Sequence, residues 1–81
     1  MGIVRYVAED DVDAALRLRD TVRGQTALLA DMPDMGRPGR VPGTRELVIA
    51  GTRYIVVYTV IRGEVVVLRV LHGARQWPER L

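Results

Sequence analysis

The chain has no cysteine, no lysine and only one histidine, His72, among its 81 residues. Without cysteine it can form neither a disulfide nor a thiolate metal site. One histidine cannot complete the usual ligand set of a zinc site, so we expect no metal and no other cofactor. All twelve basic residues are arginine. The planar guanidinium can bind phosphate in a bidentate manner, although a GC-rich genome would produce the same bias.

Long apolar runs are also missing. No run approaches the ~20 residues of a membrane-spanning helix, and no secretory signal is visible at the N-terminus. The composition, 48% hydrophobic and 27% charged, is typical of a globular protein. We therefore expect a cytoplasmic protein that makes no membrane contact and folds as a single domain over residues 1–81. A domain of this size buries only about 60–65% of its chain surface, so a partner protein is the natural source of further stability.

Charge is distributed unevenly along the chain, although the net charge is only +2. Residues 1–34 hold four arginines against seven acidic residues, a net charge of −3, whereas residues 35–81 hold eight arginines against three glutamates, a net charge of +5. A basic segment of this kind suits a polyanion or an acidic partner protein. Alternatively, the arginines have a structural role, because charged side chains on the edge strands of a small sheet prevent pairing with other chains.

The first residues are ambiguous between helix and strand. Ile3, Tyr6 and Val7 have the i, i+3, i+4 spacing of one helix face, and a short strand over the same residues is the alternative. Glu9–Asp11 then supplies an acidic N-terminal cap for a second helix over residues 13–30.

The second helix carries the stronger pattern, and with the first it would form a helical hairpin over about residues 3–31. Its apolar stripe should face the core. The residues of that stripe are Ala15, Leu18, Val22, Leu29 and Met32, with Gln25 completing the spacing.

The rest of the chain predicts a loop and then an antiparallel meander. Residues 32–43 contain three prolines and three glycines, which predicts a loop with no regular element. Three strands follow within about residues 44–72, and a tail covers residues 73–81. The strands are expected at 45–49, 54–61 and 65–71.

Helices followed by antiparallel strands are typical of an α+β domain, with a helical hairpin packed on a three-stranded antiparallel sheet. The other face of the sheet is then left for function or for a partner. In the last strand, simple alternation puts His72 on one face with Val66, Leu68 and Val70. It puts Arg69 on the opposite face with Val65, Val67 and Leu71.

Four segments, in this order and at these separations, carry a family resemblance. They are Pro33 with Gly36-Arg37, the strand start 43–47, the central strand 54–58, and the closing segment 70–78. Together they resemble the RelE/ParE toxins of bacterial type II toxin–antitoxin modules, including the plasmid-stabilisation proteins of that family.

The fold of that family runs strand, two helices, then three strands, so the resemblance implies that the first strand is missing here. A late start, a shortened chain, or a strand formed by the first apolar residues would each account for this. A missing strand would expose a sheet edge that invites pairing with another chain, including a homodimer partner.

The resemblance implies a growth-arresting toxin that a cognate antitoxin neutralises, and it divides into two activities. RelE-like members are ribosome-dependent mRNA endoribonucleases, whereas ParE-like members inhibit DNA gyrase and are not nucleases. The closing segment with Arg75 and Trp77 looks more ParE-like, which favours gyrase inhibition. Whether the chain is an enzyme therefore stays open, and a third alternative is an inactive remnant that only binds antitoxin.

A metal-free ribonuclease would need groups that move protons and stabilise charge on the phosphate. His72 could supply the acid, Glu46 the base and Arg69 the positive charge. The structural reading places His72 at the rim of the core and pairs Glu46 with a cross-strand arginine. Tyr54 and Tyr58 are then core residues with a polar tip. Candidates for binding a target or nucleic acid are Arg37, Arg40, Arg45, Arg53, Arg75 and Trp77.

Overall fold

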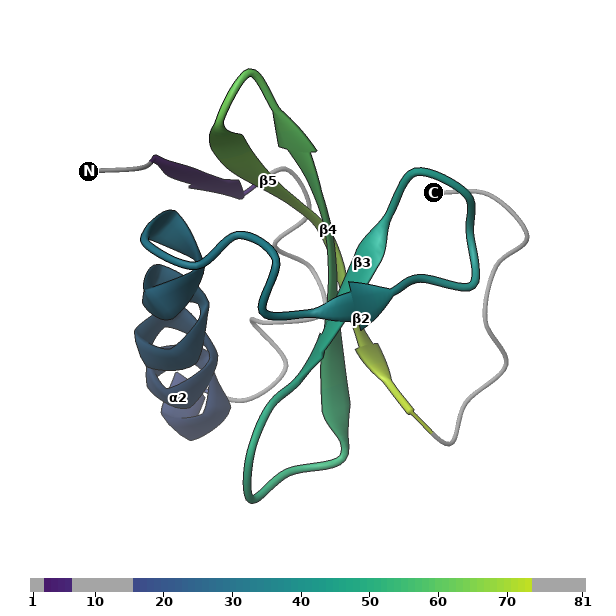
Figure 1. The fold of residues 1–81 in the computed structure, drawn as a ribbon. Coiled ribbons are helices and arrows are strands. Elements are labelled where there is room, and N and C mark those ends of the chain that lie inside the picture. Colours follow the sequence, from purple (N-terminus) through teal and green to yellow (C-terminus); the bar gives the residue numbers. More distant parts are fainter. Residues whose placement is uncertain (1–2, 7–15, 74–81) are drawn as a thin grey trace.

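The protein is a five-stranded mixed sheet with a helix on one face (Figure 1). A computed structural model of the chain describes residues 3–6 and 16–73. The sheet order is β1-β5-β4-β3-β2, with β1 parallel to β5 and the other pairs antiparallel. The predicted α+β class is confirmed. The elements are β1 (Val4–Tyr6), α2 (Leu16–Thr26), the 3₁₀ helix η1 (Ala27–Ala30), β2 (Arg37–Pro38), β3 (Arg45–Val48), β4 (Tyr54–Ile61) and β5 (Glu64–His72).

Strand β1 corrects the prediction for the N-terminus. Val4–Tyr6 is a strand and not an arm of a helical hairpin, and with β2 it raises the number of strands in the described sheet from the predicted three to five. Parallel pairing aligns Val4 with Val65, and the Val65 N–H donates to the Ile3 carbonyl at 2.8 Å. The first strand, which the family resemblance implied to be missing, is therefore present. The predicted joint at Glu9–Asp11 lies outside the described residues.

Helix α2 and η1 confirm the predicted second helix from Leu16 onward, although its last turn tightens into a 3₁₀ helix. Val22 and Leu29 are fully buried, as the apolar stripe predicts. Met32 is exposed, so its place in the stripe was wrong; it follows the end of η1. The Gln25 amide bonds both the N–H and the carbonyl of Ala50, which fixes the helix to the turn before β4. Two predicted stripe residues have side chains outside the described part: Ala15 and Leu18.

The β4–β5 hairpin confirms the predicted meander but contains a β-bulge. The register jumps from the pair Val57–Arg69 to the pair Tyr58–Val67, which leaves Leu68 as an extra residue on β5. A bulge of this kind shifts which side chains face each side of a sheet. Simple alternation along β5 was therefore wrong across this point. Alternation places Val65 and Val67 on one face and Val70 on the other, whereas all three are buried in one core.

Strand β2 lies in the segment that was predicted to be an irregular loop. Arg37 pairs with Glu46 and Pro38 pairs with Arg45, both in antiparallel register. Proline is compatible with β2 because an edge strand needs backbone donors on one side only. The loop prediction was therefore wrong for these two residues.

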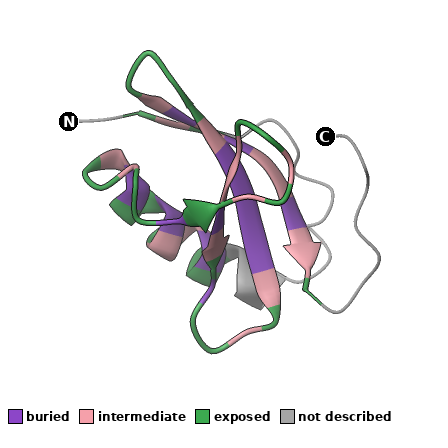
Figure 2. Cartoon of the chain, turned by 45° about the vertical axis from the view of Figure 1, so that its right-hand side comes forward, coloured by how far each residue is buried: buried purple, intermediate pink, exposed green. Residues whose placement is uncertain are grey.

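The core fills the space between the helices and the sheet, and burial is densest along β4 (Figure 2). Tyr58 is fully buried there. Its hydroxyl accepts the Gly36 N–H at 2.9 Å and donates to the Pro33 carbonyl at 2.7 Å. Any Cβ at position 36 would lie 2.6 Å from that hydroxyl, so the approach requires glycine. Tyr54 packs partly buried against the same core, which confirms the structural reading of both tyrosines.

We expect Tyr58→Phe to lower the free energy of unfolding by about 1–3 kcal/mol, because two backbone groups of the loop lose their hydrogen-bond partner. Urea titration measures the change. Tyr54→Phe is the matched control: no hydrogen bond of the Tyr54 hydroxyl occurs within residues 3–6 and 16–73, so its effect should stay within about 0.5 kcal/mol. Equal effects of the two substitutions would contradict this role of Tyr58.

Candidate functional site

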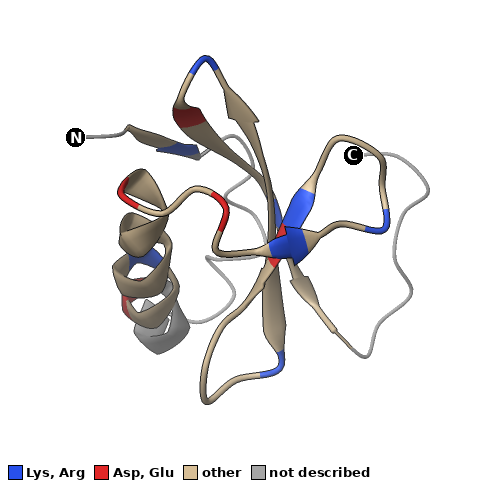
Figure 3. Ribbon diagram, in the orientation of Figure 1, with Lys and Arg blue, Asp and Glu red and all other residues tan. Residues whose placement is uncertain are grey.

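A row of four residues crosses the sheet on the face opposite α2, which we call the far face. Arg37, Glu46, Val57 and Arg69 pair side by side across β2, β3, β4 and β5. Neighbouring strands lie about 4.8 Å apart, so this far row is roughly 14 Å long. Figure 3 shows arginine gathered over β2 and the adjoining part of β3. The far row therefore has a guanidinium at each end and a carboxylate beside one of them.

Glu46 organises one end of the far row, although its side chain is only 3% exposed. Its Oε1 accepts two hydrogen bonds from the Arg37 guanidinium, at 2.9 Å and 3.3 Å. Its Oε2 accepts the Arg40 backbone N–H at 2.8 Å and Nε of the same residue at 3.3 Å. The predicted pairing of Glu46 with a cross-strand arginine is confirmed. Both guanidiniums stay about half exposed while the carboxylate fixes their positions.

Electrostatics keep the Glu46 side chain ionised. Burial is the largest single effect and raises the pKa, but it is outweighed. The backbone hydrogen bond from Arg40, the side-chain hydrogen bond from Arg37 and the positive charges of both together lower the pKa of Glu46 below its usual 4.5. A carboxylate held in this way is a poor general base, because its proton affinity is reduced.

Arg69 occupies the other end of the far row and is half-buried. No hydrogen bond or ion pair joins its guanidinium to another residue in the part of the chain that the structure describes. A guanidinium presents five donors in a rigid fork, so this side chain can receive a carboxylate or a phosphate from outside. It lies on the far face and His72 lies on the other, as alternation over residues 69–72 predicts.

His72 lies on the other side of the sheet, with the core. It pairs with Tyr54 across the two strands, and the two rings meet edge to face with centroids 5.5 Å apart. The three residues proposed for ribonuclease chemistry are thus not brought together, because Glu46 and Arg69 lie on the far face. A general acid and base must both reach the same phosphate. The rim-of-core reading of His72 agrees with its partial burial.

The remaining candidate residues are also separated. Arg45 lies on the core side of β3, donates to the Gly36 carbonyl at 2.7 Å and pairs with Asp34 at 3.6 Å. Arg53 is exposed in the turn before β4. Arg75 and Trp77 lie outside the described residues. Sequence reasoning missed the bonds from Tyr58 to Pro33 and Gly36 and the bonds from Glu46 to Arg40, because these bonds depend on the path of the loop on either side of β2.

Comparison with known proteins identifies the family. A family model described as "ParE toxin of type II toxin-antitoxin system, parDE" matches residues 2–77. The chain belongs to the ParE toxin family. The protein named Putative toxin Y4kP of Sinorhizobium fredii (strain NBRC 101917 / NGR234) is 43% identical over 76 residues, which cover 94% of this chain and 78% of that protein. The resemblance to RelE/ParE toxins is thereby confirmed, and membership of a type II module implies an antitoxin partner. No helix among the described residues is long and apolar enough to cross a membrane.

We expect Glu46→Gln to lower the free energy of unfolding by about 1–3 kcal/mol at pH 7, because the amide cannot satisfy the donors of Arg37 and Arg40. The folded pKa of Glu46 is depressed, so its ionised form stabilises the fold above the unfolded pKa. That contribution is lost as pH falls through the folded pKa. The difference in free energy of unfolding between wild type and variant should therefore become smaller below about pH 4.5.

Urea titrations across this pH range measure the effect. Glu64→Gln is the control, because among the described residues the Glu64 side chain pairs only with the exposed Arg5, and such pairs contribute about 0–1 kcal/mol. If Glu46→Gln lowers the free energy of unfolding equally at pH 7 and pH 3, the role assigned to the ionised Glu46 is contradicted.

Proposed function

We propose that the chain arrests growth by inhibiting DNA gyrase in the cytoplasm and that a cognate antitoxin neutralises it. The observation that carries this proposal is the separation of the candidate catalytic groups. His72 lies on the core side, whereas Glu46 lies on the far face and is bonded to two arginines. This arrangement, within a ParE-family chain, favours a toxin that acts by binding.

The far row is the surface that we assign to the target. Arg37 and Arg69 stand on a hydrogen-bonded sheet, so little backbone conformational entropy is lost when they bind. Glu46 holds Arg37 in place before any target arrives. Arginine on a preorganised surface is a frequent hot-spot residue at protein interfaces. Residues 35–81 also carry a net charge of +5, which attracts an acidic partner surface.

The purified chain should inhibit DNA supercoiling by gyrase. Arg69→Ala should raise the half-inhibitory concentration about tenfold or more, which corresponds to about 1.4 kcal/mol of lost binding free energy. Arg62→Asn is the charge-matched control, because Arg62 is exposed in the hairpin turn at φ 51°, a conformation that asparagine tolerates. It should inhibit as wild type does. Normal supercoiling at saturating protein would refute the proposal.

The ribonuclease alternative draws on one observation, the half-buried Arg69 that could receive a phosphate. It predicts codon-dependent mRNA cleavage on ribosomes that His72→Ala abolishes. If the wild-type chain cleaves mRNA in this way, its function is that of a ribonuclease and the proposal of gyrase inhibition is wrong. If both assays are negative and expression without antitoxin leaves growth unchanged, the remaining reading is a remnant that binds antitoxin only.

A further inference from the structure

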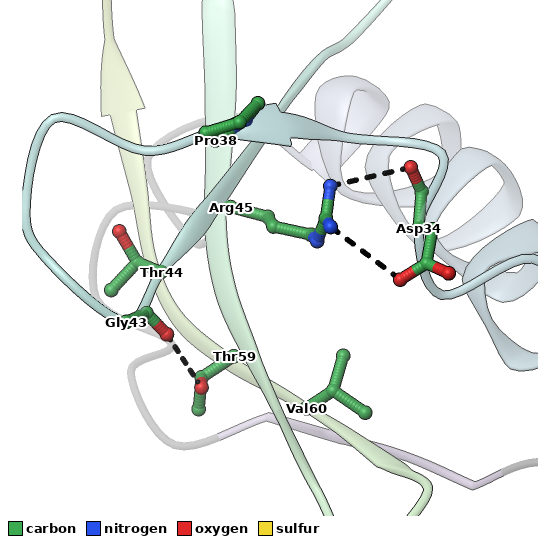
Figure 4. Close-up of a pocket in the computed structure, with 7 residues that line it drawn as sticks. All are labelled: Asp34, Pro38, Gly43, Thr44, Arg45, Thr59 and Val60. Atoms are coloured by element: carbon green, nitrogen blue, oxygen red, sulfur yellow. Dashed lines mark hydrogen bonds and ion pairs between the residues drawn. The ribbon is translucent and has the colours of Figure 1, made fainter.

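Some arginines of the described chain are balanced by a carboxylate of the same chain. Arg5 pairs with Glu64 at 2.9 Å. Arg45 lines a pocket of about 310 Å³, where it donates to the Gly36 carbonyl at 2.7 Å and pairs with Asp34 at 3.6 Å (Figure 4). At both places one positive charge therefore faces one negative charge.

Within the described residues, the far row and the adjoining Arg40 lack this balance. Three guanidiniums stand there against a single carboxylate, that of Glu46, so the net charge is +2. Arg37 and Arg40 share this carboxylate at one end, which leaves a net charge of +1 there. Arg69 supplies the second positive charge at the other end. Two separate negative charges from outside would balance these residues.

The two ends lie at a separation that an extended chain can match. The Arg37 guanidinium bonds Glu46 on the neighbouring strand, so its charge lies between β2 and β3. From there to Arg69 on β5 is between two and three strand spacings, roughly 10–14 Å. In an extended chain, side chains on one face lie about 7 Å apart at i and i+2 and about 13 Å apart at i and i+4. Only the second of these spacings fits the far row.

The middle of the far row is unsuited to a further negative charge. Glu46 is 3% exposed and Val57 is fully buried. Each oxygen of Glu46 already accepts two hydrogen bonds. Each strand of a nucleic-acid helix carries one negative charge for about every 3.4 Å of axis, so it would place charge beside Glu46 as well. A peptide can leave the middle uncharged, which favours a peptide over a nucleic acid.

We propose that the far face binds an extended acidic segment of gyrase, which crosses the strands and carries carboxylates at positions i and i+4. One carboxylate bonds Arg69, and the other bonds Arg37 and Arg40. A guanidinium binds a carboxylate through two parallel hydrogen bonds, so the spacing of the two carboxylates is selected. Because the segment runs across the strands, it uses no edge of the sheet. This inference rests on the proposed function, which assigns the far row to the target.

Two capped pentapeptides of the same composition test the spacing on the wild-type chain. Glu-Thr-Thr-Thr-Glu carries its carboxylates at i and i+4, whereas Thr-Glu-Thr-Glu-Thr carries them at i and i+2. Both have two negative charges, so a difference in affinity reports on spacing and not on net charge. We expect the first peptide to bind about threefold or more tightly in an NMR titration, because it alone reaches both ends of the far row. Equal dissociation constants, or tighter binding of the second peptide, would overturn the inference.

Arg69→Gln should remove the preference between the two peptides, because one end of the far row loses its cation. Arg62→Asn is the charge-matched control in the hairpin turn and should retain the preference. A folded Arg69→Gln variant that keeps the preference would refute the proposal, because the peptide then binds elsewhere. A thymidine trinucleotide, which also carries two negative charges, represents the nucleic-acid alternative. If it binds more tightly than the first peptide and depends on Arg69, the proposal is wrong.

The supercoiling assay separates this inference from the proposed function. If the chain inhibits gyrase, saturating Glu-Thr-Thr-Thr-Glu should restore supercoiling, and its isomer at the same concentration should restore about threefold less. If the first peptide binds through Arg69 but leaves the inhibition unchanged, the segment does not belong to gyrase and the inference fails while the proposed function stands. If the chain leaves supercoiling normal, the proposed function fails and the claim about gyrase fails with it. The titration then still decides whether the far face selects this spacing.

Discussion

The buried carboxylate of Glu46 is the interaction on which the arginine-rich side of the protein depends. A carboxylate that is removed from water needs charged partners and hydrogen bonds to remain ionised. Here the partners come from β2 and from the residue two positions beyond it, Arg40. Their bonds attach the edge strand and the following loop to β3. The same bonds hold two guanidiniums at the surface, so one interaction both stabilises the fold and positions the arginines of the face that we propose to bind the target.

Tyr58 performs the corresponding task on the core side of the sheet. Its hydroxyl bonds the loop at Pro33 and Gly36, just before the segment that Glu46 holds. Burial raises the pKa of Tyr58, which keeps the phenol protonated as the donor to Pro33. The loop between η1 and β3 is therefore attached from both faces of the sheet. This double attachment explains why a segment rich in proline and glycine has a defined path.

The strands from β3 to β5 could be predicted from the sequence because β-branched and aromatic residues mark them. The bulge could not, because Leu68 resembles its neighbours and the extra residue is defined only by the pairing with β4. Strand β1 was ambiguous because three apolar residues fit a helix face as well as a strand. Its partner, β5, lies about 60 positions away in the chain. At the candidate site the types of residue could likewise be predicted, but the bulge that places Arg69 in one row with Val57 and Glu46 could not.

The central claim is that the far face, and not the helical side, contacts gyrase. Val48 on the far face and Leu28 in η1 are both 51% exposed, so they are matched positions for a photo-crosslinking side chain. A crosslinker at position 48 should join the chain to gyrase, and the same crosslinker at position 28 should not. Crosslinks from position 28 alone, or from neither position while supercoiling is inhibited, would contradict the account.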